Sequence, residues 1–282
     1  MKEKLRHIVQ QLALKGFRRA GGPEWGSAMA LMENLIREHY PTPKIQSWKD
    51  EKGIEYRNYS MLFKGESSKK IIIAAHYDSF EETPGADDNA SAIAVLLCLS
   101  ELLCAETQLP CDIELVCYAC EEPPFFGTEE MGSFHHARHC TEDNTAFMIC
   151  LEMVGYFSEQ PDSQEYPLSF LKYLYGRRGN YLMLVSNYSS QKALKQIWKS
   201  VKNNPALNYK RFISPFNSFG MDWSDHRNYW AKGIPAVMIT DTSLFRNKNY
   251  HQLTDTANTL DYGRMALLVQ DLYCISTKKK LK

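Results

Sequence analysis

Acidic and histidine side chains recur where apolar segments of the sequence end. Three segments with the pattern of buried strands finish in such residues, which are His76, Asp78, Glu121, Glu122 and Glu152. Carboxylates and imidazoles are the groups with which proteins bind metal cations and transfer protons. Their placement at the ends of strands predicts a site for metal or proton chemistry.

The consecutive pair Glu121 and Glu122 is the sharpest of these signals. Two carboxylates at the end of a buried strand repel each other and lose hydration, which is costly unless a cation or a proton compensates. Neighbouring residues of a strand point to opposite sides, so one side chain can bind metal while the other handles a proton. His76 and Asp78 point the same way, as a metal ligand and the carboxylate that orients it commonly do.

Two further positions are ambiguous when each is considered alone. Asp87 and Asp88 precede a helical pattern over residues 90–104, where acids commonly cap a helix and interact with its dipole. A helix that starts so soon after His76 can also aim one carboxylate back toward it. His251 lies in a polar loop and, by itself, is typical of an exposed histidine.

The rest of the chain alternates between helical and strand patterns. We expect helices over residues 2–17, 27–39, 90–104, 131–138, 191–202, 223–232 and 260–275, and strands over 54–63, 69–75, 113–119, 146–151, 181–185, 211–213 and 235–240. This alternation predicts a three-layer α/β/α sandwich around a mostly parallel mixed sheet, with residues 1–282 as one domain and residues 1–50 as a helical extension packed on it. Sites in such folds lie beyond the carboxyl ends of the strands.

Composition narrows the classes of partner. The chain has 33 basic and 33 acidic side chains, so its net charge is zero, which does not favour a nucleic acid or a membrane surface. No apolar run approaches the ~20 residues of a membrane span. The start has no secretion signal, so we expect a cytoplasmic protein, with a processed secreted form as the alternative. Several of the eight cysteines lie in apolar strand or helix patterns, which predicts reduced, buried thiols rather than disulfides.

Taken in order, these residues resemble the M28 family of di-zinc exopeptidases. The similarity rests on His76-x-Asp78, Gly85–Ala92, Glu121-Glu122, Glu152, Met131–Ser133, Ser224–His226, Gly233–Ala236 and Tyr250-His251. It covers roughly residues 55 to 275 and does not extend to about the first 50 residues.

The resemblance implies two zinc ions per chain. Asp88 would bridge both ions. His76 and Glu152 would complete the shell of one ion, and Glu122 and His251 would complete the shell of the other. Residue 152 is a glutamate here, whereas many members of the family have an aspartate at this position.

The resemblance also implies roles for residues that do not bind metal. Glu121 would be the general base, Asp78 would orient His76, and Tyr250 would donate a hydrogen bond to the oxyanion. The peptide bond between Asp88 and Asn89 would be cis.

The implied activity is that of an aminopeptidase acting on peptides with a free N-terminus, and the oligomeric state is not predicted. One alternative is a glutaminyl cyclase with a single zinc ion, but the presence of both His76 and Glu152 favours two ions. The other alternative is a non-catalytic binding module, which the complete set of ligands disfavours.

Other patterns carry less weight. His135 and His139 have zincin spacing but lack the glutamate of that motif, and Cys117 and Cys120 would face opposite sides of a strand, so neither pair is expected to bind metal. Aromatic residues in loops after strands could line a pocket for bulky apolar N-terminal residues; these are Phe125, Phe126, Tyr156, Phe157, Phe216 and Phe219.

Overall fold

The computed structural model describes residues 1–214 and 220–277, so Phe216 and Phe219 lie outside the described residues. The strands are β1 (Lys44–Lys49), β2 (Glu55–Phe63), β3 (Lys70–His76), β4 (Ile113–Tyr118), β5 (Thr145–Glu152), β6 (Met183–Asn187), β7 (Lys210–Ser214) and β8 (Ala236–Thr240). The α-helices are α1 (Lys2–Leu12), α2 (Trp25–His39), α3 (Ala92–Cys104), α4 (Gly132–Ala137), α5 (Leu171–Tyr175), α6 (Gln191–Val201), α7 (His226–Trp230) and α8 (Tyr262–Thr277). Short helical turns lie at Ala86–Ser91, Ser243–Phe245 and Ala257–Thr259.

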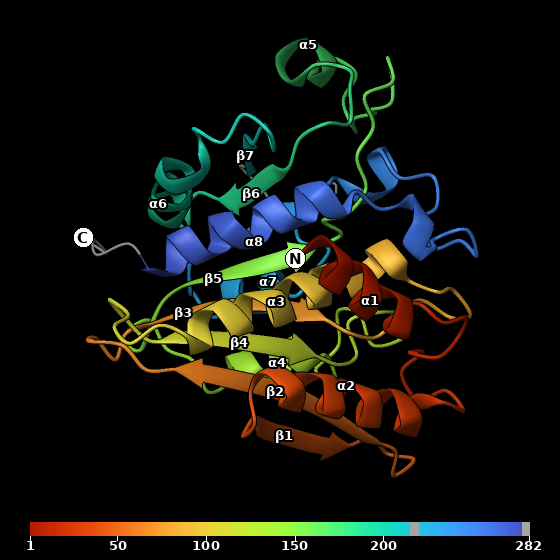
Figure 1. The fold of residues 1–282 in the computed structure, drawn as a ribbon, viewed down its shortest axis with the longest axis vertical. Coiled ribbons are helices and arrows are strands. Elements are labelled where there is room, and N and C mark those ends of the chain that lie inside the picture. The colour runs from red at the N-terminus through yellow and green to blue at the C-terminus, as the bar shows by residue number, and fades with distance from the viewer. Residues whose placement is uncertain (215–219, 278–282) are drawn as a thin grey trace.

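These strands form one mixed sheet in the order β1-β2-β4-β3-β5-β8-β6-β7. The central strands β4, β3, β5 and β8 are parallel to one another, whereas β2 and β6 run antiparallel to β4 and β8. The arrows of β3, β4 and β5 point toward the same edge of the sheet (Figure 1). Residues that follow these strands are therefore brought together at that edge.

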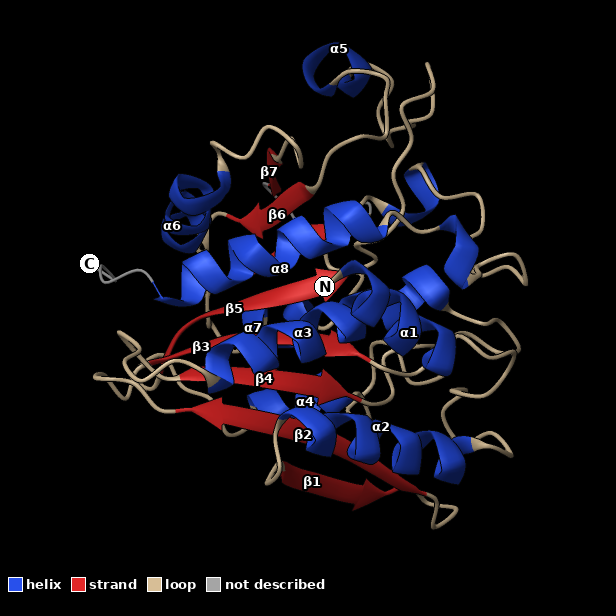
Figure 2. Cartoon of the chain, viewed as in Figure 1, coloured by secondary structure: helices blue, strands red, loops and turns tan. Residues whose placement is uncertain are grey.

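Successive residues of the central strands alternate between two apolar cores. On β3, Ile71 and Ile73 belong to one core, and Ile72 and Ala74 belong to the other. Helices α1, α2, α3 and α8 cover the first face of the sheet, while α4 and α7 cover the second (Figure 2). Strands buried on both faces need no polar alternation, which explains their continuous apolar sequences. The predicted three-layer α/β/α sandwich is confirmed.

The structure differs from the sequence-based expectations where the local pattern is weak. The first helix ends at Leu12 rather than at residue 17, because the chain turns there and buries Arg18. Strand β1 was not expected, since it is a partly exposed edge strand without an apolar run. The five-residue helix α5 was also missed, and the expected helix over 223–232 is α-helical only from His226 to Trp230.

Two expectations about the whole chain can also be compared with the structure. All eight cysteines are free thiols and six of them are buried, as predicted. Within the described residues, no helix is long and apolar enough to cross a membrane.

Candidate metal centre

Five side chains from five segments meet beyond the carboxyl ends of the central strands. His76 is the last residue of β3, and Glu152 is the last residue of β5. Glu122 follows β4, Asp88 lies in the helical turn before α3, and His251 lies in the loop after β8. Among the described residues, their donor atoms form two groups that could each hold a metal ion, and Asp88 belongs to both groups.

The two groups face opposite oxygens of Asp88. In the first group, Nε2 of His76 lies 3.3 Å from Oδ1 of Asp88 and 3.4 Å from Oε2 of Glu152. In the second group, Nε2 of His251 lies 3.2 Å from Oδ2 of Asp88 and 3.3 Å from Oε2 of Glu122. Asp88 therefore offers one carboxylate oxygen to each of the two groups.

The distances and the donor types fit zinc. Ligand atoms about 2.0–2.1 Å from a tetrahedral zinc ion lie about 3.3 Å from one another, which agrees with the separations within both groups. Oε1 of Glu122 is buried and has no hydrogen-bond partner among the described residues, and a cation would compensate its desolvation. Imidazole and carboxylate donors are common zinc ligands.

The electrostatics of these residues also favour a cation. Burial, together with the charge of Asp88, raises the pKa of Glu122 to about 8, and burial raises the pKa of Glu121 well above its ordinary value. Burial opposes protonation of the histidines, but neighbouring carboxylates raise the pKa of His76 and bring the pKa of His251 to about 10. Metal-free, these groups retain protons that a divalent ion would displace.

The backbone around Asp88 is held by residues that sequence reasoning missed. The carboxylate of Asp255 accepts hydrogen bonds from the N–H groups of Asp87 and Asp88, at 2.9 and 3.1 Å. The Asp88–Asn89 peptide bond is cis, as the resemblance implies. The side chain of Asn89 forms hydrogen bonds of 2.9 and 3.1 Å with the main chain on either side of Glu152. The turn that carries Asp88 and the end of β5 are therefore tied together.

Asp78 contacts the residues that follow two neighbouring strands. Its Oδ1 lies 3.5 Å from Nδ1 of His76. Its two oxygens also accept hydrogen bonds from the main-chain N–H groups of Glu121 and Glu122, at 3.1 and 2.9 Å. One buried carboxylate therefore fixes the imidazole relative to both glutamates, a role that the spacing His76-x-Asp78 did not reveal.

Glu121 and Tyr250 lie beside the ligand groups without belonging to either. Oε2 of Glu121 is 3.8 Å from Nε2 of His76, and both Glu121 and Tyr250 line the cavity next to the ligands. The ring of Tyr250 stacks on His251 with centroids 3.8 Å apart, and Phe80 stacks on the same imidazole at 3.9 Å. These contacts restrict the orientation of the His251 ring.

The cavity has a volume of about 440 Å³ and combines a polar end with apolar walls. Four of the five candidate ligands line its polar end, namely Asp88, Glu122, Glu152 and His251. Its apolar walls include Leu171, Tyr175, Met183, Val185, Phe212 and Met238. Phe126 lines the cavity as predicted. Phe125 and Phe157 pack against the core instead, and Tyr156 does not line the cavity.

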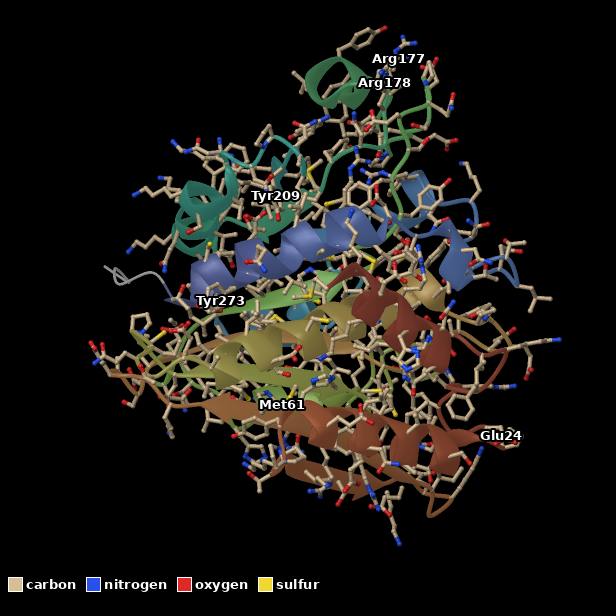
Figure 3. The ribbon with its side chains drawn as sticks, in the orientation of Figure 1. Glu24, Met61, Arg177, Arg178, Tyr209 and Tyr273 are labelled. Atoms are coloured by element: carbon tan, nitrogen blue, oxygen red, sulfur yellow. The ribbon has the colours of Figure 1, made fainter. Side chains whose placement is uncertain are left out.

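Part of the cavity wall comes from a segment that projects from the sheet. Helix α5, which contributes Leu171 and Tyr175, stands apart from the other helices at the top of Figure 1. Arg177 and Arg178 follow it near the outer end of the same segment (Figure 3). No lysine or arginine lines the cavity within the described part of the chain.

The histidine pair and the cysteine pair noted in the sequence do not belong to the two metal-binding groups of the described residues. His135 stacks on Trp48 with centroids 4.2 Å apart, and His139 is exposed. Cys117 and Cys120 are buried free thiols. Neither pair belongs to a metal-binding group within the described residues.

Comparison of the sequence with known proteins identifies the family to which this chain belongs. The family model described as Peptidase family M28 matches residues 58–271. The chain belongs to this family. An M28 relative, the uncharacterized protein YfbL of Escherichia coli strain K12, is 40% identical over 237 residues, which cover 81% of this chain and 72% of YfbL.

Solved structures similar to this M28 chain include enzymes of two kinds. The LapA aminopeptidase of Legionella pneumophila aligns with a TM-score of 0.73 and 17% identity, covering 100% of this chain and 72% of LapA. The glutaminyl cyclase of Porphyromonas gingivalis aligns with a TM-score of 0.68 and 16% identity, covering 98% of this chain and 97% of the cyclase. At these identities the likeness establishes the fold and leaves the reaction open.

Proposed function

We propose that this chain is a zinc-dependent aminopeptidase that removes N-terminal residues from peptides. The observation that carries the proposal is the position of Asp88 between two ligand groups, with Glu121 beside them at the polar end of an apolar cavity. His76 and Glu152 would hold one zinc ion, Glu122 and His251 would hold the other, and Asp88 would bridge them.

The chemistry is divided between the metal and the protein. Two bound zinc ions would lower the pKa of a water molecule toward neutrality and polarise the scissile carbonyl. Glu121 accepts the proton of the attacking water and delivers it to the leaving amine, which suits its raised pKa. Tyr250 donates a hydrogen bond to the developing oxyanion, and burial keeps its hydroxyl protonated by raising its pKa.

The charges around the cavity favour a free N-terminus over a free C-terminus. Carboxylate oxygens at the polar end that are not bound to zinc can pair with the α-ammonium group of a peptide. Since no lysine or arginine lines the described part of the cavity, a terminal carboxylate would find no cationic side chain there. The apolar walls favour a bulky apolar first residue and disfavour an acidic one.

A Glu121→Gln variant tests the proposal. We expect turnover of leucine or phenylalanine anilides to fall about 10²–10⁴-fold, with zinc content unchanged because Glu121 belongs to neither ligand group. Glu129→Gln is the matched control, since Glu129 is exposed. Full turnover in Glu121→Gln would refute its role as the base, and a wild-type protein that binds no zinc would refute the metal centre.

A glutaminyl cyclase is the second candidate, because cyclases share this fold over nearly the whole chain. Zinc content and substrate separate the two. The aminopeptidase proposal expects two zinc ions and release of the first residue of a peptide, whereas one zinc ion and cyclisation of N-terminal glutamine would support the cyclase.

A further inference from the structure

Arg18 is a buried arginine in the loop between α1 and α2, before the region that the family model matches. Its side chain is 0% exposed. All three guanidinium nitrogens donate hydrogen bonds to main-chain carbonyls. Nε donates to Leu12 at 2.9 Å, Nη1 to Tyr77 at 2.7 Å, and Nη2 to Pro84 at 3.1 Å and to Gly85.

The carbonyls of Tyr77, Pro84 and Gly85 belong to the segment that carries His76 and Asp88, whereas the carbonyl of Leu12 lies at the end of α1. Tyr77 lies between His76 and Asp78, and Gly85 begins the turn that leads to Asp88. The guanidinium of Arg18 therefore connects the end of α1 to two places in the backbone. One lies directly after His76, and the other is the turn that leads to Asp88. The planar fork of arginine suits this geometry, because it can donate to several diverging carbonyls at once.

Further contacts tie the same N-terminal loop to the segment after β3. The carbonyl of Arg18 accepts a hydrogen bond from the N–H of Ser79 at 3.1 Å, and the N–H of Gly16 donates to the carbonyl of Thr83 at 3.4 Å. The ring of Trp25 stacks on Tyr77 with centroids 5.2 Å apart and planes 5° apart. Glu24, at the start of α2, lies at the outer side of the molecule where this loop ends (Figure 3).

The turn at Gly85 is shaped to accept the guanidinium. Gly85 has φ +61°, and a Cβ there would lie 2.7 Å from Nη2 of Arg18 and 2.3 Å from the carbonyl of Asp88. Glycine permits both this conformation and this close approach.

The charge of Arg18 complements the centre without occupying it. The carboxylates whose charges act on the guanidinium are Asp78, Asp88, Asp255 and Glu122. Because its N–H groups bind carbonyls, the oxygens of these acids stay available for metal or for other donors. Burial lowers the pKa of Arg18 to about 10, so the side chain is still a cation at neutral pH.

We propose that Arg18 is a positioning residue of the metal centre, which holds the segments carrying His76 and Asp88 in the geometry that binds zinc. The inference rests on the metal centre of the proposed function but not on peptidase activity. It assigns a role at the site to a residue outside the region matched by the family model, in the N-terminal segment.

Zinc binding by Arg18→Lys and Arg18→Met tests the proposal in the full-length chain. Arg19→Met is the matched control, since Arg19 is half exposed and pairs with Glu82 at 3.6 Å. The readouts are zinc affinity, from competition with a chromophoric chelator, and the rise in Tm that zinc produces in metal-free protein. We expect Arg18→Met to lose about 10–100-fold in zinc affinity and to show a smaller zinc-induced rise in Tm. Arg18→Lys should be intermediate, because it keeps the charge but not the fork.

Two results would overturn the inference. One is wild-type zinc affinity in both Arg18 variants, and the other is an equal loss of Tm in their metal-free and zinc-loaded forms, which is the behaviour of a residue that only stabilises the fold. If Arg18→Met does not fold, Arg18→Lys decides between the same outcomes. Wild-type protein without zinc affinity would instead refute the proposed function, so the two failures are distinguishable.

Discussion

Ser224 donates a 2.7 Å hydrogen bond from its Oγ to Oε2 of Glu152. The same oxygen lies 3.4 Å from Nε2 of His76. A glutamate has one more rotatable bond than an aspartate, so its carboxylate needs an additional contact to keep a fixed position. Ser224 supplies that contact, which would hold the carboxylate of Glu152 in place as a metal ligand.

A Ser224→Ala variant should therefore weaken zinc binding in the first group. We expect about a 10–100-fold loss of affinity for one ion, the usual cost of removing a residue that orients a metal ligand. Titration of metal-free protein with zinc in the presence of a chelator measures it. Ser186→Ala is the control, because the buried hydroxyl of Ser186 has no hydrogen-bond partner among the described residues. Equal zinc affinities in the two variants would contradict the role of Ser224.

The number of zinc ions bound per chain, compared between wild type and variants, should test whether Asp88 bridges two ions. We expect about two zinc ions per wild-type chain, and about one in His76→Ala or His251→Ala, because each histidine belongs to one group only. Asp88→Ala should retain less than either histidine variant, since it removes a donor from both groups. Elemental analysis after dialysis against a weak chelator measures this, and an Asp88→Ala variant that keeps two ions would disprove the bridge.

The apolar walls should determine which first residue is accepted. Val185 and Met238 are direct neighbours on β6 and β8, and both line the cavity. Val185→Phe would fill part of the cavity, so kcat/KM for a phenylalanine anilide should fall about tenfold or more, while that for an alanine anilide changes little. The Tm of the variant controls for overpacking. A uniform loss on both substrates would show that the cavity does not receive the side chain.

The buried pair His136 and Glu114 should make stability depend on pH. Burial opposes protonation of His136, but hydrogen bonds with Cys140 and Glu114 raise its pKa from 6.5 to about 9. Burial disfavours the charged form of Glu114, but His136 and Lys70 lower its pKa from 4.5 to about 2.

The signs of these two shifts define a pH window. The raised pKa of His136 stabilises the fold fully below pH 6.5, and this contribution is lost as the pH rises through about 9. The lowered pKa of Glu114 stabilises the fold above pH 4.5 and is lost as the pH falls through about 2. We expect the difference in Tm between wild type and His136→Gln to shrink from pH 6.5 to pH 10. A difference that stays constant with pH would contradict the ionised pair.

The sequence predicted the ligand residues better than the contacts that hold them. His76, Glu122 and Glu152 end buried apolar strands, so a polar residue there breaks a strong local pattern. Ser224 was noted only as part of the family resemblance, and Asp255 was not noted. Neither breaks such a pattern, because their partners lie far away in the chain and are set only by packing. Arg18 was missed for the same reason.

The helices and strands with a strong local sequence pattern were also predicted, and those without one were missed. The central strands were predicted because burial on both faces leaves continuous apolar runs. Strand β1 was missed because half of an edge strand faces solvent and no run of apolar residues marks it. Helix α5 is too short for helical periodicity to show, and several of its side chains are exposed.

The projecting segment that contains α5 lies between β5 and β6, after four of the five ligands in the chain and before His251. It supplies part of the cavity wall but none of the donor atoms. Under the proposed function, exchange of this single stretch of surface chain would change which first residue the cavity accepts and would leave the five metal-binding side chains in place.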